Sequence, residues 1–121
     1  MPIDYLIDEH IRSWLGDMLA REGVRRGNPI HFLDVGDHDA PSLGSTDPEL
    51  LAWAAENGYV LVSMDKKTMS THFANLLVAG NHSAGVFLVR RKTPLSVAID
   101  FLMYAAIESS EGEWADSITY V

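Results

Sequence analysis

Three acidic residues of this chain have the type and the placement to hold a metal ion together. Asp8 directly follows an apolar strand pattern, Asp65 directly follows another, and Asp47 opens a helical pattern between them. In a fold that alternates strands and helices, strand ends and the starts of the next helices lie at one edge of the sheet. Carboxylates that converge there repel one another, and Mg²⁺ or Mn²⁺ offsets the repulsion because such hard cations prefer oxygen ligands. The pattern therefore favours metal-dependent chemistry on phosphodiesters.

Each of these acids also has a structural explanation, which is helix capping. Asp8 and Asp65 precede helical patterns, where an aspartate can accept a hydrogen bond from a free backbone N–H group. Thr46 and Glu49 have the spacing of a capping box, in which each side chain satisfies the other residue's backbone donor. Capping accounts for any one of these residues. Three acidic helix starts at one edge, however, gather more negative charge than three caps require, and this coincidence favours a shared site.

The basic residues are few but unevenly placed. The formal net charge of −8 argues against a protein that binds nucleic acid by overall attraction, because phosphate neutralisation needs lysine and arginine. Several basic residues nevertheless follow closely on expected strand ends, where they would surround the acidic edge and grip phosphate groups. These residues are Arg12, Lys66, Lys67, Arg90, Arg91 and Lys92. Ordinary solvated surface charge is the alternative explanation for them.

Length and composition limit the class of protein. A chain of 121 residues fits a single domain, residues 1–121, that folds without cross-links. Cysteine is absent, so any metal site must use oxygen or imidazole ligands. The sequence shows no signal-peptide pattern, and no apolar run approaches the roughly 20 residues that span a bilayer. We therefore expect a cytoplasmic protein that does not enter a membrane.

Hydrophobic periodicity predicts strands and helices in alternation. Near-continuous apolar runs, typical of buried parallel strands, occur at 3–7, 30–35, 59–63 and 85–89. Helical spacing of apolar residues occurs at 11–19, 47–56, 69–77 and 95–106. Four βα units predict an α/β fold with a parallel sheet and right-handed crossovers. The final segment, 114–121, has β character at 118–121 and could add a short edge strand, through which two copies could pair as a homodimer.

Three segments, in their order along the chain, carry a resemblance to a known family. Leu6–His10, Thr46–Leu51 and Val60–Asp65 resemble the motifs of the compact PIN-like family related to VapC toxins and Mut7-C nuclease domains. The similarity extends from the first strand through the strand at 85–89. It implies a three-layer α/β/α sandwich with a central parallel sheet of about four strands. It also implies a Mg²⁺- or Mn²⁺-dependent ribonuclease, with RNA as substrate and, for the toxin of a toxin–antitoxin pair, an antitoxin protein as partner.

The resemblance also implies roles for particular residues. The implied metal ligands are Asp8, Asp47 and Asp65, with Glu49 as a reserve ligand in the catalytic set. Many relatives have a second aspartate two residues after the one that corresponds to Asp65, and this chain has Lys67 there. Thr68 follows and could assist through its hydroxyl group, but a threonine does not replace the missing charge.

Two other functions fit parts of the sequence. Lys67 and the acidic composition suit an interaction module that descends from a nuclease and has no catalytic activity. A phospho-accepting receiver domain has a similar length, an acidic pair after its first strand and an acceptor aspartate after its third. Asp8 and Glu9, Asp65, and Lys92 match this layout. Receivers, however, place the lysine after a fifth βα unit, and the pattern contains four before the tail.

Overall fold

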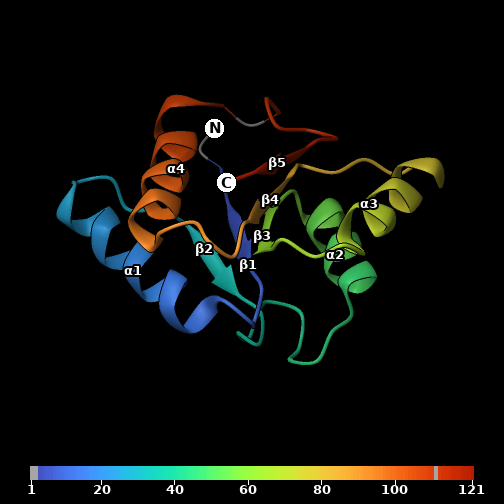
Figure 1. Cartoon of the computed structure of the whole chain (residues 1–121), viewed down its shortest axis with the longest axis horizontal. Helices are drawn as coiled ribbons and strands as arrows, with labels where there is room; N and C mark the ends of the chain where they lie inside the picture. The colour runs from blue at the N-terminus through green and yellow to red at the C-terminus, as the bar shows by residue number, and fades with distance from the viewer. Residues whose placement is uncertain (1–2, 111) are drawn as a thin grey trace.

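One parallel sheet organises the molecule. The computed structural model describes residues 3–110 and 112–121, except for the side chains of residues 12 and 13. Five strands lie in the order β2-β1-β3-β4-β5, and every neighbouring pair is parallel (Figure 1). The strands are β1 (Tyr5–Ile7), β2 (Phe32–Asp34), β3 (Val60–Met64), β4 (Val86–Val89) and β5 (Ile118–Tyr120). The predicted α/β class is confirmed, and the C-terminal segment supplies the fifth strand at an edge.

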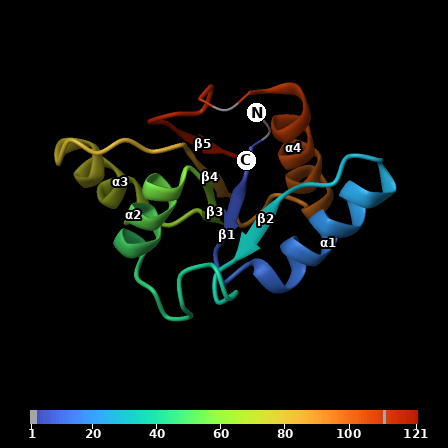
Figure 2. The ribbon, with the colours of Figure 1, turned by 180° about the vertical axis from the view of Figure 1, so that it is seen from behind.

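Helices cover both faces of this sheet. They are α1 (Arg12–Arg25), α2 (Asp47–Asn57), α3 (Met69–Val78) and α4 (Leu95–Glu108). Figures 1 and 2 show α1 and α4 on one face and α2 and α3 on the other. The molecule is therefore a three-layer α/β/α sandwich, as the family resemblance implied. Among the described residues, no helix is both long and apolar enough to cross a bilayer.

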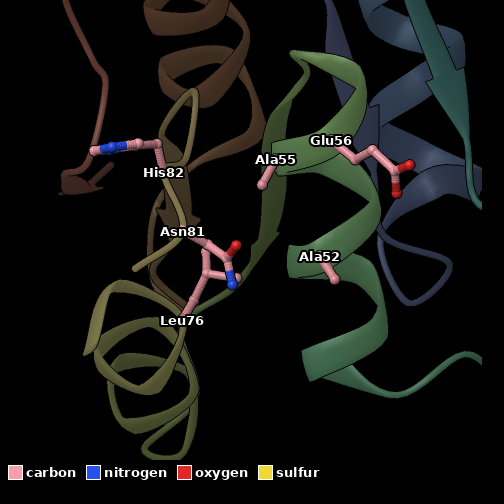
Figure 3. Close-up of a pocket in the computed structure, with 6 residues that line it drawn as sticks. All are labelled: Ala52, Ala55, Glu56, Leu76, Asn81 and His82. Carbon is pink, nitrogen blue, oxygen red and sulfur yellow. The ribbon is translucent and has the colours of Figure 1, made fainter. Parts of the chain in front are cut away.

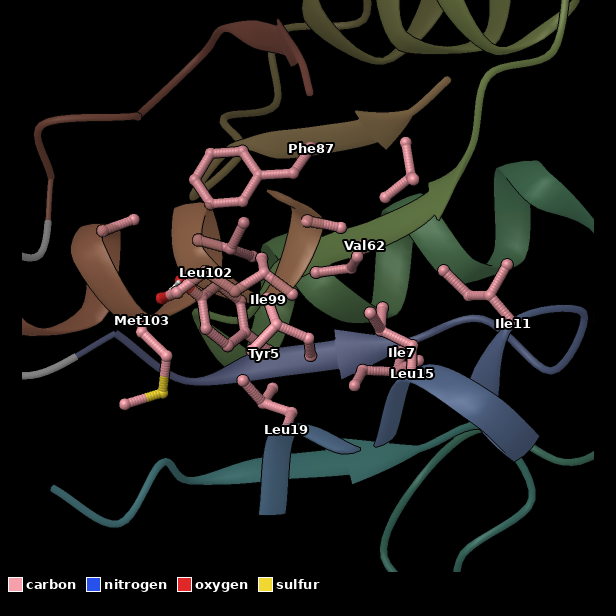
Figure 4. Packing of buried hydrophobic residues seen from close by; sticks show 14 of the residues in the cluster. Tyr5, Ile7, Ile11, Leu15, Leu19, Val62, Phe87, Ile99, Leu102 and Met103 are labelled. Atoms are coloured by element: carbon pink, nitrogen blue, oxygen red, sulfur yellow. Dashed lines mark hydrogen bonds between the residues drawn. The ribbon is translucent and has the colours of Figure 1, made fainter. Parts of the chain in front are cut away.

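Alternation along each strand divides the core into two halves. On the first face, Tyr5, Val62 and Phe87 pack with α1 and α4 (Figure 4). The hydroxyl group of Tyr5 is buried there and donates a 2.8 Å hydrogen bond to the backbone carbonyl of Leu102. On the second face, Leu88 belongs to the cluster formed with α2 and α3. Since successive strand residues point to opposite faces, this division also fixes the face of each residue at the strand ends.

The connection through α4 differs in hand from the other three. The connection through α1 moves toward the β2 edge with its helix on the first face. Those through α2 and α3 move toward the β5 edge with their helices on the second face, so these three connections share one hand. The connection through α4 also moves toward the β5 edge, but α4 lies on the first face beside α1. The right-handed rule expected for the four βα units therefore does not extend to the connection through α4, which leads to the added fifth strand.

Packing accounts for this exception. A third helix on the second face would leave the first-face side chains of β3 and β4 exposed, since α1 alone covers little beyond β1 and β2. In the observed arrangement, Ile99 and Leu102 of α4 lie in one buried cluster with Val62 and Phe87. Residues 109–117 then return the chain to the outer edge of β4, where β5 pairs.

Candidate functional site

The candidate site lies at the carboxyl ends of β1 and β3. From β1 the chain moves to β2, and α2 then carries it back across β1 to β3, so the direction of winding changes between β1 and β3. In open α/β sheets, ligands bind outside the carboxyl ends of the strands at such a switch point. Asp8 follows β1, and Asp65 and Lys66 follow β3. The topology therefore brings together segments that are distant in the sequence.

Asp8 is a buried acid at this point. Its exposed fraction is 1%, and its Oδ2 atom accepts a 2.7 Å hydrogen bond from the hydroxyl group of Ser63, which is also buried. The register explains the contact, because Ile7 is the partner of Val62 and the next residues along the two strands are Asp8 and Ser63. Burial of a carboxylate is costly unless the charge is paired and hydrogen-bonded. Ser63 supplies the hydrogen bond and fixes the orientation of the carboxylate.

Lys66 supplies the opposite charge. Its Nζ atom lies 3.4 Å from Oδ2 of Asp8 and 3.3 Å from Oδ1 of Asp47. The lysine side chain is 30% exposed, so the ammonium group lies at the mouth of the site rather than in the core. One cation is therefore shared by two carboxylates from different elements.

The start of α2 positions Asp47. Thr46 is the N-cap residue and forms the predicted capping box with Glu49. The Oε1 atom of Glu49 accepts hydrogen bonds from the backbone N–H group and the hydroxyl group of Thr46, each at 2.8 Å. These bonds, the backbone one first, lower the pKa of Glu49 from its ordinary value. Glu49 thus holds the helix start in place, while the neighbouring Asp47 turns to Lys66.

Capping does not explain the other acids. The N-cap residue of α1 is Ile11 and that of α3 is Thr68, and neither of these caps has a side-chain hydrogen bond. Asp8 instead meets Ser63 and Lys66. Helix capping therefore explains the position of Glu49 but does not explain that of Asp8.

A loop is tied to the same site. The Oε1 atom of Glu9 accepts a 2.8 Å hydrogen bond from the backbone N–H group of Gly44, in the segment that leads into α2. Gly44 has φ of +83°, a left-handed conformation that favours glycine. Glu9 therefore fastens the approach to α2, and with it Asp47, to the end of β1.

The remaining predicted site residues lie around this centre. Asp65 is exposed at the end of β3, and its backbone N–H group donates to the carbonyl of Val89. The exposed residues that follow β3 and β4 are Lys67, Thr68, Arg90, Arg91 and Lys92. The side chain of Arg12 lies outside the described residues. The structure therefore brings two of the expected acids to one cation and places the third at the rim.

Sequence reasoning passed over two residues of this edge. Ser63 is a polar residue inside an otherwise apolar strand, and that interruption was the available signal. Asp34 ends β2 on the first face, where its Oδ1 atom would lie 2.8 Å from a Cβ atom built on Gly16. A side chain at position 16 would therefore collide with this carboxylate, and glycine lets α1 approach the end of β2.

The donor set suits a hard divalent cation with few protein ligands. In the chain as described, no group of three acidic or imidazole side chains is placed to hold one metal ion. Mg²⁺ is nevertheless commonly held by one or two carboxylates, with water and substrate phosphate filling the other positions. Asp8 and Asp47 already share one cation, the ammonium group of Lys66, which stands where a metal ion would balance the same charges. The residues present therefore fit Mg²⁺ or Mn²⁺ bound by two carboxylates.

A separate pocket lies between α2 and α3. It has a volume of about 420 Å³ and is lined by Ala52, Ala55, Glu56, Leu76, Asn81 and His82 (Figure 3). These residues include none of the acids that follow β1 and β3. The switch-point site is therefore distinguished by its charges and topology and not by this cavity.

Comparisons with known proteins do not assign this chain to a family. No family model, no curated protein and no solved structure matches the chain. The fold class is a doubly wound α/β sandwich, and the site is a carboxylate pair at its switch point.

Proposed function

We propose that this protein is a Mg²⁺- or Mn²⁺-dependent ribonuclease of the PIN-like type, with the metal ion held between Asp8 and Asp47. The observation that carries the proposal is the position of Lys66, whose ammonium group lies 3.4 Å and 3.3 Å from these two carboxylates. A site that attracts a monovalent cation from its own chain at the switch point has the charge to attract a divalent one. The sequence resemblance to nucleases supports the same chemistry.

The residues have separable roles in this reaction. Ser63 orients Asp8, and the capping box at Thr46 orients Asp47, so both carboxylates are preorganised before substrate binds. The metal ion, when bound, supplies an activated water molecule and stabilises the charge that develops on the phosphate. With a divalent ion on the two carboxylates, the ammonium group of Lys66 would be displaced and would be available to bind a phosphate oxygen.

Exposed basic residues extend the site toward a long substrate. Lys67 follows β3, and the run 90–92 follows β4, so these cations line the same edge of the sheet as Asp8. Asp65 and Thr68 lie along the same rim. In a chain of net charge −8, such local clustering is what directs a polyanion to this edge.

The proposal is tested by incubating the purified protein with single-stranded RNA and Mn²⁺. We expect cleavage that EDTA abolishes and that Asp8→Asn reduces by at least about a hundredfold, on the scale of losing an electrostatic catalytic group. Asp17→Asn is the matched control, since Asp17 is an exposed acid on α1. Intact RNA under Mg²⁺ and Mn²⁺ across a range of pH would contradict the proposal.

A toxin role extends the same proposal to the cell. Expression of an active ribonuclease in the cytoplasm would arrest growth unless an antitoxin protein bound and blocked it. We expect growth arrest with the wild-type chain and normal growth with Asp8→Asn at equal protein levels. Equal growth of the two strains would contradict the toxin role. It would not bear on the ribonuclease activity, which the cleavage assay tests.

One observation favours a second candidate, an interaction module without catalytic activity. Lys66 neutralises the buried Asp8 without any metal ion, and Lys67 stands where many relatives of the PIN-like family have an acid. If this function is correct, the protein cleaves no RNA with any divalent ion, and Lys66→Met destabilises the fold whether or not Mn²⁺ is present.

A further inference from the structure

One row of residues crosses the sheet at its carboxyl edge. Ser63 is in register with Leu88, and Leu88 is in register with Tyr120 of β5. At the other end of the row, Asp8 lies beside Ser63 and is hydrogen-bonded to it. Residues in register on parallel strands share a face, so Asp8, Ser63 and Tyr120 belong to the second face of the sheet.

The packing of neighbouring residues confirms this placement. Leu88 and Ile118 lie in the second-face cluster, whereas Val121 packs with the first-face cluster. Alternation then puts Tyr120 on the second face. Two strand spacings separate it from Ser63, which is roughly 10 Å along the sheet. Tyr120 is thus within reach of a nucleotide that neighbours a phosphate bound at the proposed metal site of Asp8 and Asp47.

Tyr120 is exposed and is already paired with a cation. Its exposed fraction is 45%, and the guanidinium carbon of Arg90 lies 5.6 Å from the centre of its ring. The end of β5 is fixed in this position, because the carbonyl oxygen of Val121 accepts hydrogen bonds from the hydroxyl group of Thr93 and the backbone N–H group of Arg90. The two planar groups therefore form a preorganised surface at the rim.

We propose that Tyr120 and Arg90 form a stacking subsite for a base of single-stranded RNA, next to the proposed metal site of Asp8 and Asp47. This inference rests on the proposed ribonuclease function and names its substrate class. Aromatic rings and guanidinium groups stack on the faces of unpaired bases, with little dependence on sequence. Bases within a duplex are stacked on one another, so a duplex offers no free face to such a surface. The positive charge of the run 90–92 adds attraction for the backbone of the same strand.

Binding without cleavage tests the subsite. Fluorescence anisotropy of a short labelled oligouridylate is measured with Ca²⁺ in place of Mn²⁺, since Ca²⁺ also binds carboxylate oxygens, and the same strand annealed to its complement is the second probe. We expect Tyr120→Leu to weaken single-strand binding roughly 5- to 150-fold, the range for loss of one base–aromatic stack. Tyr120→Phe keeps the ring and should bind within about twofold of wild type. Duplex binding should be weak and unchanged in all variants.

A matched control and a second variant keep the result decisive. Tyr104→Leu changes another tyrosine, 56% exposed on α4, and should leave binding unchanged. Arg90→Gln leaves β5 intact and should weaken binding and reduce its salt dependence, so it tests the subsite even if Tyr120→Leu unfolds. Wild-type affinity in both Tyr120→Leu and Arg90→Gln would overturn the subsite.

The two proposals fail separately. Single-strand binding that depends on Tyr120, without cleavage in Mn²⁺, would support the subsite and overturn the nuclease. Cleavage with no effect of either rim substitution would support the nuclease and overturn the subsite. An absence of both cleavage and single-strand binding would overturn both.

Discussion

At the scale of residues, the site depends on how one lysine is shared by two acids. Burial of Asp8 requires a counter-charge, and Lys66 provides it to Asp8 and Asp47 at once. The sequence indicated that acids would gather at this edge, because their positions after strand patterns are visible in the chain. It did not indicate that Lys66 would lie between them, since such a contact depends on the side chain folding back over the end of β3. Lys66 was expected to contact phosphate instead.

Replacing Lys66 should therefore raise the affinity for divalent ions. Lys66→Met removes the resident cation but keeps an unbranched apolar stem, which leaves the two carboxylates without their counter-charge. We expect Mn²⁺ to bind at least about tenfold more tightly, equivalent to about 1.4 kcal/mol. Isothermal titration calorimetry measures this, and Lys67→Met serves as control because Lys67 is exposed. Unchanged or weaker Mn²⁺ binding in Lys66→Met would mean that the lysine does not occupy the place of the metal.

At the scale of elements, the start of α2 could be predicted in detail and the path of α4 could not. The capping box of Thr46 and Glu49 is a local pattern, and its hydrogen bonds form as the sequence indicated. At the start of α4, Pro94 is the N-cap residue and makes no side-chain cap, while the hydroxyl group of the preceding Thr93 donates to the carbonyl of Val121. Which face of the sheet a helix covers depends on the space that the other helices leave. The sequence of the helix itself does not contain that information.

The capping box should support both stability and the site. Thr46→Ala removes the cap and should lower the free energy of unfolding by about 1 kcal/mol. Because Asp47 is the next residue, the same substitution should also weaken Mn²⁺ binding. Urea unfolding and a Mn²⁺ titration measure the two effects. Thr46→Ser keeps the capping hydroxyl group, so its stability and its Mn²⁺ affinity should stay close to those of wild type. A loss of stability with unchanged Mn²⁺ affinity would show that Asp47 does not bind the metal ion.

The segment before β5 should respond to pH through Asp116. Its carboxylate accepts hydrogen bonds from the backbone N–H group of Ser83 and from His82, and these bonds lower its pKa, the backbone bond most. A lowered pKa stabilises the fold above the ordinary carboxyl value and ceases to do so as the pH falls through the folded value. Asp116 has φ of +57°, which asparagine tolerates, so Asp116→Asn tests the charge with little strain.

We therefore expect wild type and Asp116→Asn to differ most near neutral pH. The difference in their free energies of unfolding should shrink as the pH falls below the ordinary carboxyl pKa of about 4 and on through the lower folded value, because Asp116 then takes up a proton first in the unfolded chain and afterwards in the folded one. Urea unfolding at pH 7 and pH 3 checks this. A difference that stays constant over that range would show that the charge of Asp116 does not stabilise the segment.

At the scale of the whole molecule, the fold explains why the site lies where it does. The change of winding direction between β1 and β3 opens the sheet edge at which Asp8, Ser63 and Lys66 meet. The number of βα units and the parallel sheet followed from hydrophobic periodicity, which records how each segment is buried. The residues that complete the site come from contacts between segments distant in sequence, and periodicity does not record those.

The most direct test of the account is the effect of Mn²⁺ on thermal unfolding of the wild-type chain and of Asp8→Asn. An ion that fills its site at a hundredfold excess over Kd stabilises the native state by about 2.7 kcal/mol, which raises Tm by several degrees. We expect this rise in wild type and its loss in Asp8→Asn, with Asp17→Asn behaving as wild type. A wild-type Tm that does not respond to saturating Mn²⁺ would contradict the claim that Asp8 and Asp47 form a metal site.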